Sequence, residues 1–111
     1  MNIPERPRAI ILSRVNEMVY TNIRPVIKTS RTGKPGSFSV WEDRYKTRQR
    51  LKGWVEYANQ TQQIVSDLEE CISKDISRYV GITGYDLDND VDRFYMVYKP
   101  GSIQNNISDT D

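Results

Sequence analysis

Two runs of charged residues are the first candidates for chemistry in this sequence. The run Asp86-Leu87-Asp88-Asn89-Asp90-Val91-Asp92 has the D-x-D-x-D spacing with which calcium loops begin. A calcium loop then needs glycine at its sixth position and glutamate at its twelfth, where this chain has Val91 and Val97. The run therefore favours a plain solvated loop, then an acidic docking loop, and last a weak, adventitious cation site. No metal or other cofactor is expected to be part of the protein.

The second run is basic and has lysine or arginine at every second position. Its members are Arg44, Lys46, Arg48, Arg50 and Lys52. Basic side chains with aromatic neighbours suit contact with phosphate backbones. No helix-turn-helix, zinc-finger or RNP pattern frames the run, so a solvated helix end explains it as well as contact with nucleic acid does.

Catalytic residues are scarce in this chain. It has no histidine, and Cys71 is its single cysteine. This composition removes the commonest general base, zinc sites built from histidine and cysteine, and nucleophiles activated by histidine. We expect Cys71 to be a buried, inert thiol, and we expect the protein not to be an enzyme, with no small-molecule substrate evident.

Charge is divided unevenly along the chain. Residues 1–52 contain twelve lysines and arginines against four acidic residues, a net charge of +8. Residues 53–111 contain four against eleven, a net charge of −7. Either the two halves fold over one another and their fields cancel, or the separation serves association with a partner.

Length and composition indicate one modest globular domain. The chain has 111 residues, of which 37% are hydrophobic and 28% charged. No apolar run approaches the ~20 residues of a membrane span, and the first residues lack the apolar core of a signal peptide. We expect a cytoplasmic protein that does not enter membranes.

The element that dominates the predicted fold is one long amphipathic helix over residues 40–80. Ser39 and Glu42 match a capping box, and apolar residues then recur at spacings of three and four, with Gly53 as a weak point. Such a helix would be on the order of 60 Å long, about twice the width of a small domain. It therefore either overhangs its domain, breaks near Gly53, or packs against another copy or a partner. Its apolar seam around Trp54, Val65 and Leu68 is a candidate contact surface.

Shorter elements surround this helix in the prediction. Residues 1–8 should form an extended arm and residues 9–20 a helix, although residues 9–12 also suit a buried strand. Residues 26–31 and 37–39 should form a hairpin across the turn at 32–36, residues 82–92 a polar loop, and residues 93–98 a strand. The predicted class is α+β, with a single domain over residues 9–101 and a polar tail over residues 102–111.

These features favour an assembly or adaptor subunit that binds copies of itself or a protein partner, with a nucleic-acid-binding protein as the alternative. We expect Arg44, Arg48 and Arg50 of one copy to face acidic residues of the next, continuing into a ring or filament. The apolar seam would supply most of the affinity. The acidic candidates are Glu69, Glu70, Asp86, Asp88, Asp90 and Asp92.

Overall fold

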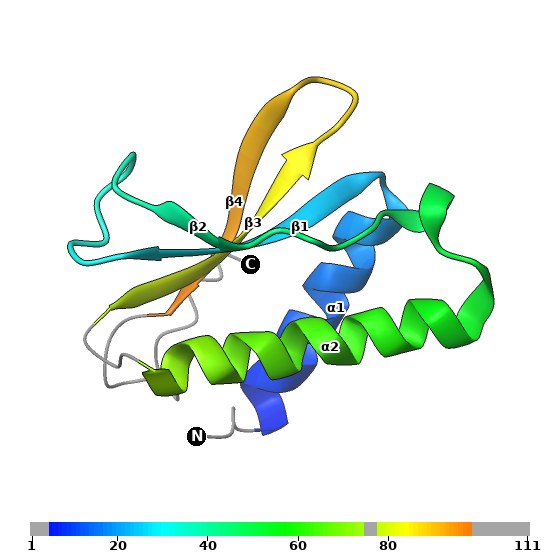
Figure 1. Cartoon of the computed structure of the whole chain (residues 1–111), viewed down its shortest axis with the longest axis horizontal. Helices are drawn as coiled ribbons and strands as arrows, with labels where there is room; N and C mark the ends of the chain where they lie inside the picture. The colour runs from blue at the N-terminus through cyan, green and yellow to red at the C-terminus, as the bar shows by residue number, and fades with distance from the viewer. Residues whose placement is uncertain (1–4, 75–77, 99–111) are drawn as a thin grey trace.

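The computed structural model describes residues 5–74 and 78–98. Within them, two α-helices, one short 3₁₀ helix and four strands follow one another (Figure 1). In chain order they are α1 (Glu5–Tyr20), β1 (Ile23–Ser30), β2 (Ser39–Glu42), the 3₁₀ helix η1 (Arg48–Arg50), α2 (Gly53–Lys74), β3 (Tyr79–Asp86) and β4 (Val91–Tyr98). The predicted α+β class is confirmed.

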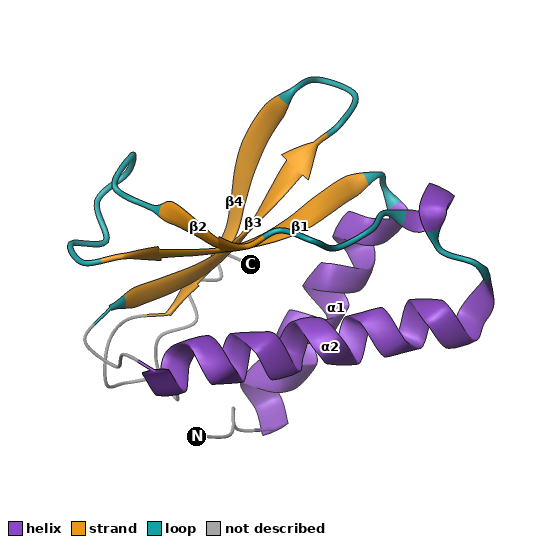
Figure 2. Cartoon of the chain, viewed as in Figure 1, coloured by secondary structure: helices purple, strands orange, loops and turns teal. Residues whose placement is uncertain are grey.

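The sheet is antiparallel, with strand order β2-β1-β3-β4. The central strands β1 and β3 pair along their whole length, from Ile23 opposite Asp86 to Ser30 opposite Tyr79. Both helices lie on one side of the sheet (Figure 2). The core therefore forms between the helices and the central strands, where Ile27 and Ile82 lie opposite each other and are fully buried.

Helix α1 forms because its apolar residues recur at helical spacing. Ile11, Val15, Met18 and Val19 are at most 1% exposed. Asn22 ends the helix in the left-handed conformation, with φ of 63°, which asparagine tolerates. The predicted helix at 9–20 is confirmed, but it begins at Glu5, so residues 5–8 are helical where we expected an extended arm.

The predicted long helix is wrong at its start. The segment around Ser39 forms β2, so Ser39 caps no helix and the predicted capping box does not form. Val40 pairs with Lys28 of β1, and this pairing satisfies backbone groups that a helix would have bonded internally. Helix α2 begins instead at Gly53, whose φ of 80° is a conformation that glycine adopts without strain.

The predicted long helix is also wrong at its end. α2 stops at Lys74, and Tyr79 begins β3. Val80 and Ile82 fill the centre of the sheet, and a strand buried on both faces has an apolar run that resembles the continuation of a helical stripe. The 22 residues of α2 span about 33 Å, which matches the longest dimension of the fold, 36 Å, so the helix does not overhang its domain.

Residues 82–92 were predicted to form a loop, and this prediction is wrong. They form the middle of the hairpin made by β3 and β4. β3 continues to Asp86, β4 begins at Val91, and only residues 87–90 form the turn. The strand predicted at 93–98 is confirmed as part of β4. The tail predicted at 102–111 lies outside the described residues.

Two glycines in the β1–β2 turn allow the packing of this turn to be tested. Gly33 and Gly36 both have left-handed backbones, with φ of 75° and 82°. A Cβ on Gly33 would lie 2.9 Å from ring carbons of Tyr79, whereas nothing lies within 4 Å of a Cβ on Gly36. Gly36→Ala should therefore cost about 1–2 kcal/mol of backbone strain, and Gly33→Ala should cost more because the ring must also move. Chemical denaturation measures both losses, and equal losses would contradict this packing.

Candidate functional site

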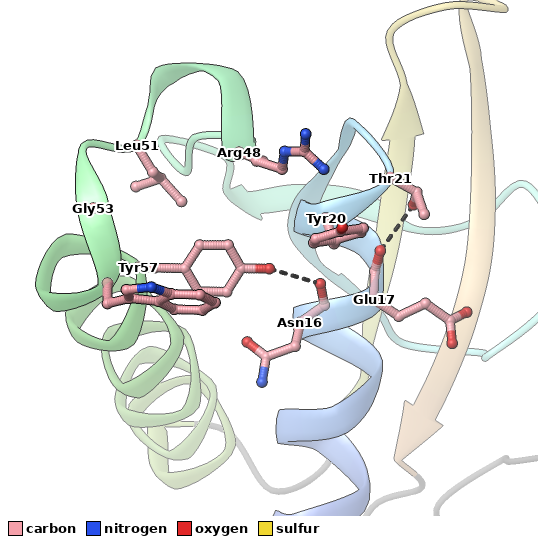
Figure 3. A pocket seen from close by; sticks show the side chains of 9 residues that line it. Asn16, Glu17, Tyr20, Thr21, Arg48, Leu51, Gly53 and Tyr57 are labelled. Carbon is pink, nitrogen blue, oxygen red and sulfur yellow. Dashed lines mark hydrogen bonds between the residues drawn. The ribbon is translucent and has the colours of Figure 1, made fainter.

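The most distinctive surface feature is an apolar pocket of about 550 Å³ between the end of α1 and the start of α2 (Figure 3). Its lining comes from α1, from η1 and the residues that follow it, and from the first turn of α2. The lining residues are Asn16, Glu17, Tyr20, Thr21, Arg48, Leu51, Gly53, Trp54 and Tyr57. We call this feature the aromatic pocket.

Tyr20 and Arg48 form one wall of the aromatic pocket. Tyr20 is the last residue of α1 and is 61% exposed. The Arg48 guanidinium carbon lies 4.6 Å from the centroid of the Tyr20 ring, so the cation stacks on the aromatic face, as Figure 3 shows. The wall therefore presents an apolar surface with a positive charge at its edge.

Trp54 and Tyr57 form the opposite wall. Their ring centroids are 6.0 Å apart with the planes tilted by 55°, an arrangement that aromatic pairs favour. The Tyr57 hydroxyl donates a hydrogen bond of 3.0 Å to the carbonyl of Asn16 in α1, and partial burial raises the pKa of this phenol. This bond, together with one from the Thr61 hydroxyl to the Asn16 side chain, ties α2 to α1 beneath the pocket.

Trp54 is the most exposed large hydrophobic residue at the pocket, at 83%. Val55 beside it is 75% exposed. The other two members of the predicted apolar seam, Val65 and Leu68, are fully buried in the core, where each contributes about 1.5–3 kcal/mol to folding. Of the three seam residues, only Trp54 remains available to a partner of the folded chain.

The structure divides the basic run into two parts. It does not lie on a helix as predicted, but in an extended connection followed by η1. Arg44 bonds Glu42 at 2.9 Å and thereby lowers the pKa of that carboxyl, and the Lys46 ammonium lies 3.8 Å from Glu56. Arg50 and Lys52 are exposed and make no ion pair within the described part of the chain.

The connection between β2 and η1 is anchored on α2. The Tyr45 hydroxyl donates a bond of 2.6 Å to Asp67, and burial together with this carboxylate raises the pKa of Tyr45. The Gln60 amide bonds both the backbone N–H and the carbonyl of Lys46, each at 2.7 Å. These contacts hold the connection that leads into η1, and through it the position of Arg48.

The predicted acidic residues do not gather in one patch. Glu69 forms an ion pair with Arg8 of α1, and Glu70 lies 3.6 Å from Lys74. Asp92 pairs with Lys28 at 3.0 Å. Ion pairs between described residues therefore join the basic half to the acidic half, among them Arg8–Glu69, Lys28–Asp92 and Lys46–Glu56.

Asp86 is buried and organises the β3–β4 turn. Its carboxylate accepts hydrogen bonds from the backbone N–H groups of Asp88 and Asn89, from the Asn89 amide and from Arg93. The bond from the Asn89 amide is the largest of the effects that lower the pKa of Asp86. Among the described residues, no group of three acidic or cysteine side chains could hold a metal ion.

Cys71 is a buried free thiol, as predicted. Burial raises its pKa to about 11. The thiol is therefore protonated at neutral pH and is a poor nucleophile.

Tyr20 and Tyr57 line the aromatic pocket, although neither was among the contact residues predicted from the sequence. The spacing of three residues between Trp54 and Tyr57 was a usable signal, because residues three apart share a helix face. Tyr20 offered no such signal, since only the packing of α1 against α2 brings it to the pocket.

Comparison of the chain with protein-family models and with curated proteins found no match. Neither helix in the described residues is long and apolar enough to cross a membrane.

The carboxylate of Asp86 predicts a dependence of stability on pH. Because its pKa is lowered in the folded state, the ionised group stabilises the fold above its unfolded pKa of about 4, and this contribution is lost as the pH falls through the folded pKa. Asp86→Asn should therefore be less stable at pH 7 and lose less stability in acid than the wild type does.

Asp90→Asn is the matched control, because Asp90 lies in the same turn with φ of 55°, which asparagine also adopts. Denaturation curves between pH 7 and pH 3 measure the difference. Identical pH profiles for the two variants would contradict the role assigned to Asp86.

Proposed function

We propose that this chain is a non-enzymatic assembly or adaptor subunit, which binds copies of itself or a protein partner at the aromatic pocket. The observation that carries the proposal is the exposure of two large aromatic side chains on opposite walls of the pocket, Trp54 at 83% and Tyr20 at 61%. Tryptophan, tyrosine and arginine are the residues that most often dominate binding energy at protein interfaces. Exposed apolar clusters of this kind commonly mark interaction sites.

The charges beside the pocket define what a partner should carry. Arg48 stacks on Tyr20, and Arg50 and Lys52 follow it with exposed side chains. A partner that inserts an apolar side chain and brings carboxylates to this edge would match both features. The apolar contact would provide most of the affinity, because exposed ion pairs contribute little and mainly set orientation and association rate.

The opposed charges predicted from the sequence still contribute to the proposed contact, but fewer residues take part in it. The ion pairs Arg8–Glu69, Lys28–Asp92 and Lys46–Glu56 cancel part of the basic field inside the fold. The apolar stripe of α2 is buried, so only the first turn of α2 serves as a contact. Arg44 and Lys46 have carboxylate neighbours in their own chain, which leaves Arg48, Arg50 and Lys52 as the basic contact residues.

The proposal predicts that Trp54→Ser weakens association. Loss of an interface tryptophan typically costs roughly 2 kcal/mol or more, which corresponds to about 30-fold in the dissociation constant. Sedimentation over a concentration series measures self-association, and retention of extract proteins on the immobilised chain measures binding of foreign partners. Val40→Ser is the control, because Val40 is 57% exposed on β2 and does not line the pocket.

The expected result is that Trp54→Ser loses a self-association or a retained protein that the wild type and Val40→Ser keep. A wild type that stays monomeric at low salt, and that retains the same proteins as Trp54→Ser, would remove the proposal.

A second candidate function, binding of single-stranded nucleic acid, has one observation in its favour. Arg50 and Lys52 lie close in sequence to the exposed ring of Trp54, and single-strand binding combines backbone-tracking cations with aromatic stacking platforms. A sequence pI of about 7.8 is low for a dedicated nucleic-acid binder.

Gel retardation at low salt distinguishes this second function. If it operates, single strands should bind with a steep salt dependence, and replacement of Arg48, Arg50 and Lys52 by glutamine should abolish binding. Trp54→Ser should weaken binding by about tenfold, because stacking contributes roughly 1–3 kcal/mol per base. Absence of retardation for the wild type would end this alternative.

A further inference from the structure

The β3–β4 turn is a second surface with exposed apolar side chains. Leu87 is 45% exposed and Val91 is 43% exposed, at the start of the turn and just after its end. Asp88 and Asp90 are exposed between them. In Figure 1 the hairpin projects from the sheet away from the helices.

The shape of this turn is held before any partner arrives. The Asp86 carboxylate accepts bonds from the N–H groups of Asp88 and Asn89, and the Asp90 N–H donates a bond of 2.8 Å to the Asp86 carbonyl. The Asn22 amide, just after α1, donates a bond of 3.3 Å to the side chain of Asp88. Because the turn is preorganised, binding through it would require little loss of conformational entropy.

The turn and the aromatic pocket are complementary in chemistry. The turn offers aliphatic side chains flanked by carboxylates. The pocket offers aromatic walls with Arg48 in its lining, and the exposed Arg50 and Lys52 alternate in sequence with the lining residues Leu51 and Gly53. Leu87 does not line the pocket of its own chain, since the turn is tied to Asn22 and extends away from the helices. The matching surface must therefore come from another molecule.

We propose that the aromatic pocket binds the β3–β4 turn of a second copy of this chain. Leu87 of one copy enters between Tyr20 and Trp54 of the other, and Asp88 faces Arg50 across the contact. This inference rests on the proposed function and names the occupant of the same pocket. Exposed apolar area on both surfaces, together with opposite charges around it, selects a second copy over an unrelated partner.

The positions of the two surfaces favour a closed pair. Both flank the C-terminal end of α1, because Tyr20 lines the pocket and Asn22 binds the turn. Two copies related by a two-fold axis can then exchange turns reciprocally, so that both pockets are filled at once. A two-fold pair replaces the ring or filament that the charge pattern alone suggested.

The apolar part of the contact is tested with the full chain by sedimentation over a concentration series. Leu87→Ser should raise the dissociation constant of the dimer by roughly tenfold or more, because the buried leucine side chain is lost from the contact. Val40→Ser removes an exposed valine away from both surfaces and should leave the dimer unchanged. Thermal melts of each variant verify that the fold is intact.

The charged part is tested by mixing two variants. Arg50→Glu alone places two carboxylates opposite each other at both contacts, and Asp88→Lys alone places two cations there, so each variant should be monomeric. In an equimolar mixture, Glu at position 50 meets Lys at position 88, while the other contact keeps its natural residues. A reciprocal dimer should therefore reappear only in the mixture. Lys34→Glu, the same charge change on the β1–β2 turn, should dimerise with itself like the wild type. In a mixture with Asp88→Lys it should form no mixed dimer, so the Asp88→Lys variant should stay monomeric.

The outcomes separate this inference from the proposed function. If the wild type dimerises, but Leu87→Ser does not weaken the dimer and the mixture shows no rescue, the β3–β4 turn is not the occupant of the pocket. The proposed assembly function would still hold. If the wild type is monomeric but retains a foreign protein through Trp54, a second copy is not the occupant of the pocket. The proposed adaptor function would still hold. A monomer without a Trp54-dependent partner overturns both.

Discussion

The pairing of β1 with β3 is the constraint on which the rest of the structure depends. The two strands come from opposite halves of the chain and pair from Ile23–Asp86 to Ser30–Tyr79. A shift of one residue would put Ile27 and Ile82 on opposite faces of the sheet, so one of them would point away from the helices, because side chains alternate between the faces of a strand. The buried core under α1 and α2 therefore specifies this register.

This register also decides which charges cancel and which remain. By laying the acidic half of the chain on the basic half, it places Lys28 beside Asp92, and packing of the helices places Arg8 beside Glu69. Ion pairs near the surface add little stability, but these two cancel part of the field that the separated halves would have produced. Within the basic run, Arg50 and Lys52 make no ion pair in the described part of the chain, and they follow Arg48, which lines the aromatic pocket.

The same register connects the pocket with the turn that we propose as its ligand. Because Ile23 lies opposite Asp86, the end of α1 and the β3–β4 turn occupy one end of the sheet. Asn22 can therefore bond Asp88 while Tyr20, two residues earlier, forms a wall of the pocket. A chain without histidine and with one buried thiol still has a surface suited to recognition, because recognition needs exposed shape and charge rather than activated nucleophiles.

The sequence by itself determined the elements whose signals are local. The spacing of Ile11, Val15 and Met18 predicted a helix over residues 9–20 of α1, with a strand over residues 9–12 as the alternative. The glycines at 33 and 36 predicted the hairpin turn, and alternating aromatic and β-branched residues predicted the strand at 93–98. Composition alone excluded catalysis by histidine. These inferences succeed because none of them requires knowing which residues lie close together in the folded chain.

Only the tertiary structure decided what residues 39–52 and 79–86 become. Pairing with β1 made strands of residues 39–42 and 79–86, because their backbone groups are satisfied there by residues outside the local segment. Residues 43–52 then form the connection that leads through η1 to α2. The aromatic pocket follows from the same long-range packing. Tyr20 and Trp54 are separated by more than thirty residues, and no local pattern links them until α1 and α2 meet on the sheet.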